Sequence, residues 1–95
     1  MTTKMTTTAK RNAFSDAIIR HELGHILTTN ADVVNMRKWL KQKSQRWWTT
    51  TISKYSQVNS YEAIAEVFSA VTSKEYVVGT LPRKMEIMVS DMITR

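Results

Sequence analysis

The chain has 95 residues, of which 42% are hydrophobic and 23% are charged. This length suits one domain, and this composition is typical of a folded globular protein, which excludes extensive disorder and fibrous repeats. The absence of cysteine excludes disulfides and thiolate metal sites, while a net charge of +6 favours acidic partners without identifying one.

The first half of the chain predicts an N-terminal arm followed by two helices. Residues 1–11 are rich in threonine and lack periodicity, which is typical of a flexible arm or a short edge strand. From residue 12 to residue 28 the apolar period is helical. Residues 32–47 predict a second helix with Asp32 as a possible N-cap and an apolar stripe on one face. Its other face carries a cluster of cations: Arg37, Lys38, Lys41, Lys43 and Arg46.

The second half predicts two more helices and two short strands. Residues 49–53 are mostly β-branched and could form a strand, and residues 77–80 could form a strand or a turn. Asn59 is a good N-cap for a helix over about residues 60–73. Pro82 suits the first turn of a final helix, whose inward face carries Met85, Met88, Val89 and Met92. The expected fold is α+β and mostly helical, a small domain with about four helices and minor strands.

The segment most informative about function is His21-Glu22-Leu23-Gly24-His25, an HExxH motif within the first predicted helix. Residues four apart share one helix face, so both imidazoles can reach a single metal ion. Glu22 directly follows the first histidine, where it can reach a water on that metal without binding the metal itself. The alternative is a helix that carries two partly buried histidines and no metal.

A catalytic zinc site needs three protein ligands and an open position. The chain has no third histidine, and Thr28 and Ala31 stand where a metzincin motif would have glycine and histidine. The third ligand must therefore be one of the downstream carboxylates: Asp32, Glu62, Glu66, Glu75, Glu86 or Asp91. Glu62 and Glu66 are four residues apart, so one could bind the metal while the other accepts a hydrogen bond from a ligand histidine. On spacing alone, two solvated glutamates on a helix surface remain an equal alternative.

The segment downstream of the motif reads Y-S-Q-V-N-S-Y-E-A-I-A-E-V-F-S-A over residues 55–70. HExxH followed by Y-x-x-x-N-x-x-E-x-x-A-E-x-F-x-A resembles the zincin core of the anthrax lethal factor family. It also resembles the metallopeptidase-like domains of phage head-morphogenesis proteins. The resemblance covers roughly residues 15–71 and implies that residues 12–95 form a single zincin-like domain.

The resemblance implies a zinc-dependent metallopeptidase of the gluzincin type, which hydrolyses peptide bonds through a metal-activated water. Its zinc ligands would be His21, His25 and Glu62. Glu22 would be the general base, Glu66 would hydrogen-bond a ligand histidine, and Tyr55 would donate a hydrogen bond to the oxyanion. Only 20 residues precede the first histidine, whereas zincins carry a sheet there that aligns the peptide substrate. A partner chain would then complete the substrate cleft, or the cleft has been lost.

Two other functions stay open on the sequence alone. The chain could be a catalytically inactive, zinc-stapled component of a phage-type virion or assembly, because a small core gains stability from a bound metal. It could also be a basic nucleic-acid-binding module, since the cations of residues 37–46 adjoin Trp47 and Trp48. Nucleic acid is the less favoured partner, because a charged helix face is usually solvated and adjacent tryptophans in a small domain usually belong to the core.

The expected location follows from two negative observations on the sequence. No apolar run approaches the roughly 18 residues of a membrane helix, and residues 1–20 lack the apolar region of a secretory signal. We therefore expect a cytoplasmic protein, or on the alternative above a virion protein, that acts on a peptide or protein substrate and does not bind membranes.

Overall fold

The structure is a computed structural model and describes residues 17–95. Its first described helix covers residues 17–27 and carries the HExxH motif, and we refer to it as the HExxH helix. The elements that follow are α2 (Asn30–Gln42), α3 (Gln45–Thr51), the 3-10 helix η1 (Lys54–Gln57), α4 (Ser60–Val71) and α5 (Arg83–Thr94). None of the helices in this part of the chain is both long enough and apolar enough to span a bilayer.

No strand occurs among residues 17–95, so the predicted α+β class with minor strands was wrong, and this part of the chain is all-helical. Of residues 49–53, which were predicted as a strand, the first three form the last turn of α3. There Thr49 donates its hydroxyl hydrogen to the carbonyl oxygen of Gln45 at 3.0 Å, and Thr50 bonds the preceding turn in the same way. Such bonds satisfy a threonine hydroxyl within a helix, so β-branching alone does not decide the local structure.

Residues 77–80, predicted as a short strand or a turn, adopt the second of these and form turns between α4 and α5. Gly79 has a φ of +95°, a conformation that favours glycine. Its backbone N–H donates to a carboxylate oxygen of Glu86 on α5 at 2.7 Å. A single short strand would have no partner among the helices, whereas this turn is closed by a bond to α5. The arm expected over residues 1–11 lies outside the described residues.

The single helix predicted for residues 32–47 is two helices in the structure. α2 stops just before Ser44, which caps α3 by accepting a hydrogen bond from the backbone N–H of Trp47 at 3.1 Å. A serine in this position satisfies a donor that would otherwise lack a partner, so the second helix can start afresh. α2 also begins earlier than predicted, because Thr29 is its N-cap. Asp32 completes the capping box by accepting from the Thr29 N–H at 3.0 Å.

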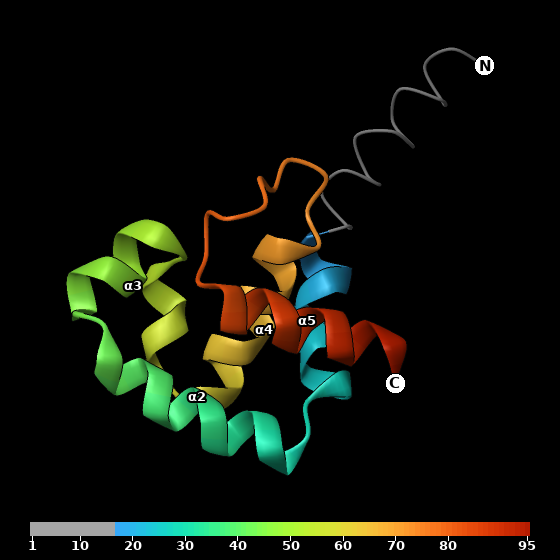
Figure 1. Ribbon diagram of the computed structural model, residues 1–95, viewed down its shortest axis with the longest axis horizontal. Coiled ribbons are helices and arrows are strands. Elements are labelled where there is room, and N and C mark those ends of the chain that lie inside the picture. The colour runs from blue at the N-terminus through green and yellow to red at the C-terminus, as the bar shows by residue number, and fades with distance from the viewer. Residues whose placement is uncertain (1–16) are drawn as a thin grey trace.

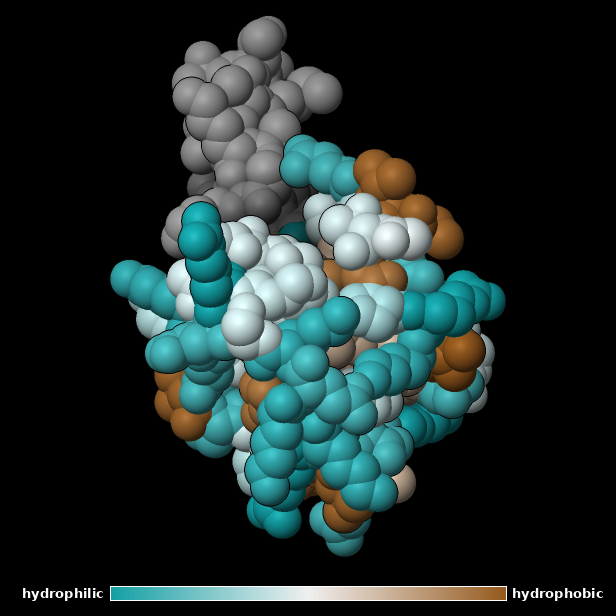
Figure 2. All heavy atoms as spheres, turned by 60° about the vertical axis from the view of Figure 1, so that its left-hand side comes forward, coloured by the Kyte–Doolittle hydropathy of each residue, from teal (hydrophilic) through white to brown (hydrophobic). Residues whose placement is uncertain are grey.

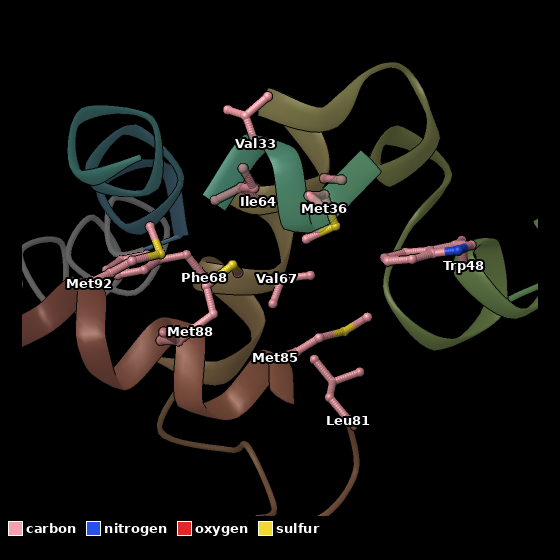
Figure 3. Packing of buried hydrophobic residues seen from close by; sticks show 12 residues of the cluster. Val33, Met36, Trp48, Ile64, Val67, Phe68, Leu81, Met85, Met88 and Met92 are labelled. Carbon is pink, nitrogen blue, oxygen red and sulfur yellow. The ribbon is translucent and has the colours of Figure 1, made fainter. Parts of the chain in front are cut away.

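The core is built around α4, which packs against α2, α5 and η1 (Figure 1). Asn59 caps α4 by accepting from the Glu62 N–H at 2.9 Å, as the sequence predicts. Pro82, predicted in the first turn of the last helix, is instead the N-cap residue of α5, one position before the helix begins. Apolar side chains of α2, α3, α4 and α5 meet in one cluster (Figure 3), which includes Met36, Trp48, Ile64, Phe68, Met85, Met88 and Met92. Of the twelve residues of α4 only Tyr61 is exposed, so this helix sets the positions of its neighbours.

Candidate metal centre

The HExxH helix passes very close to α4 at Gly24. A Cβ atom at this position would lie 2.8 Å from Ala65 Cα and 3.1 Å from Phe68 Cβ, both on α4. Only glycine lets the two backbones approach this closely. A hydrogen bond also connects the two helices near this point: Arg20 of the HExxH helix donates from Nε to the carbonyl oxygen of Ser69 on α4 at 3.1 Å. The crossing brings the histidines on either side of Gly24 within reach of the glutamates of α4.

Two histidines and one glutamate converge at this crossing. His21 Nε2 lies 3.1 Å from one carboxylate oxygen of Glu62, and His25 Nε2 lies 3.0 Å from the other. The two imidazole nitrogens are 3.2 Å apart. Ligand atoms of a tetrahedral zinc ion, each bound at about 2.0–2.1 Å, are separated by roughly 3.3 Å. Each of the three contacts is therefore close to the separation between zinc ligands, although the two contacts of Glu62 use different carboxylate oxygens. We call the three side chains the metal triad.

Glu66 fixes the orientation of one of these histidines. Its Oε2 lies 3.2 Å from His21 Nδ1, and its Oε1 accepts a hydrogen bond from the Ser53 hydroxyl at 2.7 Å. A carboxylate beside Nδ1 favours the imidazole tautomer with the proton on that nitrogen. The lone pair of a neutral His21 is then on Nε2, the atom that faces Glu62 and His25.

The electron-rich atoms that face one another in the triad favour the binding of a cation between them. The lone pair of His21 Nε2 and the electron-rich carboxylate of Glu62 face each other at 3.1 Å, and they repel unless a proton or a metal ion lies between them. Two imidazole nitrogens and a carboxylate oxygen form a donor set that zinc accepts in catalytic sites. The triad side chains are 27–31% exposed, so water can reach a fourth position. The residues present therefore fit a zinc ion.

The two remaining residues of the predicted site lie nearby in the fold but outside the triad. Glu22 is exposed on the HExxH helix, one residue after the first ligand position. Tyr55 lies on η1, which packs against α4, and its ring is 56% exposed beneath the ammonium group of Lys54, 5.2 Å from the ring centre. Within residues 17–95 no hydrogen bond joins the Tyr55 hydroxyl to the triad, so its part in catalysis stays a prediction.

Asp32, the candidate ligand closest in sequence to the motif, has a structural role instead. It is buried, and its carboxylate accepts two hydrogen bonds from Arg95, at 2.7 and 3.1 Å. Burial on its own raises the pKa of Asp32. The hydrogen bonds from Arg95 and Thr29 outweigh that effect, so the net pKa lies below its ordinary value. This carboxylate is therefore not available to a metal.

The other candidate carboxylates are also occupied elsewhere or exposed. The hydrogen bond from the Gly79 N–H, followed by that from the Tyr76 hydroxyl at 2.6 Å, holds the pKa of Glu86 below its ordinary value. Partial burial and the same bond to Glu86 raise the pKa of Tyr76. Glu75 and Asp91 are exposed, and neither belongs to the metal triad.

Two residues that shape the site were not identified from the sequence. Gly24 carried a usable signal, because glycine in a helix interior costs roughly 1 kcal/mol relative to alanine and usually has a packing reason. Ser53 carried none, since its bond to Glu66 spans 13 residues and depends on how η1 folds back onto α4.

The contacts of His21 and His25 with the two glutamates thus join the HExxH helix to α4. Comparison with protein-family models, with curated proteins and with solved structures finds no match.

Proposed function

We propose that the protein is a zinc-dependent metallopeptidase of the gluzincin type, with zinc held by His21, His25 and Glu62. The observation that carries this proposal is the convergence of the three side chains, whose ligand atoms, one from each residue, all lie within 4.8 Å of one another. The motif places the histidines four residues apart on one helix, and the fold supplies the carboxylate from a second helix. That combination of ligand types and spacing is typical of a hydrolytic zinc site.

The surrounding residues have the chemistry that peptide hydrolysis needs. Zinc bound by the triad would supply a Lewis acid that lowers the pKa of a water molecule towards neutrality. Glu22 would accept a proton from that water and pass it to the amine that leaves. Tyr55 would donate a hydrogen bond to the oxygen of the peptide carbonyl as negative charge develops there.

The exposure of the triad favours catalysis over a purely structural metal. A structural zinc site is closed by four protein ligands, whereas three ligand side chains converge here, each 27–31% exposed. A structural site also has no use for an exposed glutamate beside the first ligand. Because no strand lies among residues 17–95 to align a peptide, we propose that a partner chain completes the substrate cleft.

A comparison of wild type with Glu22→Gln tests the proposal. The substitution keeps the size and polarity of the side chain and removes its ability to accept a proton. Zinc content should stay at about one ion per chain, while cleavage of a peptide library should fall by on the order of 10²–10⁴. Glu75→Gln, a substitution at an exposed acidic residue outside the triad, is the matched control and should cleave like wild type.

Three outcomes would count against the proposal. Equal cleavage by wild type and Glu22→Gln would point to a contaminating protease. Absence of cleavage by a fully zinc-loaded wild type would favour the zinc-stapled assembly component. An undiminished zinc content in His21→Ala would show that His21 is not a ligand and would contradict the assignment of the metal triad.

A further inference from the structure

The charges of this protein are segregated along the chain. Residues 33–61, which contain most of α2 and all of α3 and η1, carry six Lys and Arg and no Asp or Glu. The other described residues carry five Lys and Arg against seven Asp and Glu, and three of those acids lie in or beside the metal centre. The excess positive charge of the described chain therefore belongs to one group of elements.

Five of these cations form what we call the basic surface, and all five are exposed: Arg37, Lys38, Lys41, Lys43 and Arg46. None of them forms an ion pair with another residue in the part of the chain that the structure describes. Lys84 of α5 adds a sixth charge, because its ammonium group lies 5.4 Å from the ring centre of Trp39 on α2. Figure 2 shows the α2–α3 side of the molecule, where hydrophilic side chains predominate and apolar ones are scattered.

Solvation alone is a poor explanation for this surface. Surface helices usually mix the two signs, because acid–base pairs three or four residues apart stabilise the helix and like charges at that spacing destabilise it. Arg37 and Lys41 are a like-charge pair at this spacing, and α2 has no acidic residue after its first turn. A partner that carries phosphate groups would neutralise this charge and relieve the repulsion.

We infer that the basic surface binds the phosphate backbone of a nucleic acid without reading its sequence. Five exposed cations beside exposed amide side chains, here Gln42 and Gln45, suit the phosphates of a nucleic-acid backbone. Base stacking is not part of the inference, because Lys43 already lies over the ring of Trp47 and Lys84 over that of Trp39. The scattered apolar groups on this face do not suit insertion into a lipid surface.

This binding is independent of the metal centre. The basic surface belongs to α2 and α3, whereas the metal triad belongs to the HExxH helix and α4. His21→Ala and added chelator should therefore leave nucleic-acid binding unchanged. The inference stands or falls separately from the proposed peptidase activity.

Fluorescence anisotropy with the full chain and a labelled DNA duplex of about 20 base pairs tests the inference. The association constant is measured from about 50 to 200 mM salt, and five phosphate contacts predict a log–log slope of about −4.5. Lys38→Gln/Lys41→Gln should reduce the size of that slope by about 2 and weaken binding by on the order of tenfold. Both side chains are exposed, so the fold should survive.

The matched control is Lys74→Gln/Arg83→Gln, which removes the same charge from exposed positions outside the basic surface and should keep the wild-type slope. A change of duplex sequence should also leave affinity unchanged. Lack of binding at about 50 mM salt, or equal weakening by both double variants, would overturn the inference. Displacement of the duplex by poly-glutamate at equal charge concentration would also overturn it, in favour of an acidic protein partner.

Discussion

At the scale of single residues, the two glutamates of α4 have different surroundings although they are four positions apart on one helix. Both oxygens of Glu62 are directed at the histidines, at 3.1 and 3.0 Å. Glu66 has one oxygen beside His21 and the other bonded to Ser53. A carboxylate held at both oxygens keeps one orientation, and it therefore holds the His21 ring as well.

This difference predicts unequal effects on metal binding. Glu62→Ala removes a ligand and should abolish tight zinc binding, whereas Glu66→Ala removes only the partner of a ligand and should weaken binding by roughly 10–100-fold. Competition with a chromophoric chelator measures both dissociation constants, with Glu75→Ala as a control that should bind like wild type. A larger loss of zinc from Glu66→Ala than from Glu62→Ala would reverse the two assignments.

Residue type and spacing predicted which side chains would meet at the candidate site, but they did not distinguish the two glutamates by themselves. The HExxH pattern places both imidazoles on one helix face, and that placement needs no tertiary information. The distinction between Glu62 and Glu66 depends on Ser53, which is 13 residues away from Glu66 in sequence. This contact forms only when η1 packs against α4, so it cannot be predicted from the pattern of neighbouring residues in the sequence.

At the scale of elements, the distance between the HExxH helix and α4 is set by Gly24. Gly24→Ala should move the two helices apart, because the new Cβ would lie 2.8 Å from Ala65 Cα. Overpacking costs about 1–3 kcal/mol, and the better helix propensity of alanine offsets roughly 1 kcal/mol of it. The free energy of unfolding should therefore fall by about 0–2 kcal/mol. Zinc affinity should fall on the order of tenfold or more, since ligands must stay within about 0.5 Å of their working positions.

Zinc titration and thermal melting of the metal-free protein separate these two effects. Ile26→Ala is the matched control, because Ile26 is 74% exposed on the same helix and its truncation should leave zinc affinity unchanged. Wild-type zinc affinity in Gly24→Ala would show that the close crossing does not position the ligands.

The boundaries of elements were predictable where one local residue determines them. Asn59 determines the start of α4 with its own side chain, which accepts a backbone hydrogen bond, and Pro82 predicted the start of α5 to within one residue. The break between α2 and α3 was missed because the apolar stripe continues through Ser44, whose capping role competes with that stripe. The strand predicted for residues 49–53 failed for a different reason, since a strand requires a partner that this helical fold does not offer in residues 17–95.

At the scale of the whole molecule, the ion pair between Arg95 and Asp32 connects the end of α5 to the start of α2. Arg95 donates to the carboxylate of Asp32 and also to the carbonyl oxygen of Leu27, the last residue of the HExxH helix, at 2.8 Å. Asp32 is buried and also holds the start of α2. The C-terminal residue thus joins α5 to the connection between the HExxH helix and α2.

This tie predicts a specific dependence of stability on pH. The pKa of Asp32 is lower in the folded protein than in the unfolded chain, so its contribution is complete above the unfolded value of about 3.9 and is lost as pH falls through the folded value. Asp32→Asn should lower the free energy of unfolding by about 1–3 kcal/mol at pH 7, the usual worth of hydrogen bonds to a charged group.

Urea unfolding of wild type and Asp32→Asn across a pH series measures this contribution. The difference between the two proteins should be constant at neutral pH and should shrink once the pH falls below about 4. Glu75→Gln is the control, and its stability should follow that of wild type throughout. A difference for Asp32→Asn that persists unchanged to the lowest pH would show that the carboxylate charge is not what stabilises the fold.

The burial of α4 restricts how this protein can diverge. Eleven of its twelve residues are buried or half-buried, and they serve the core and the metal centre together. A substitution that repacks the core should also displace Glu62 and Glu66, so α4 should tolerate fewer mutations than the other helices do. Descendants of a common ancestor should therefore keep α4 and the glycine of the HExxH helix long after α2 and α3 have drifted. Distant relatives should therefore be easiest to detect when only the sequences of the HExxH helix and α4 are compared.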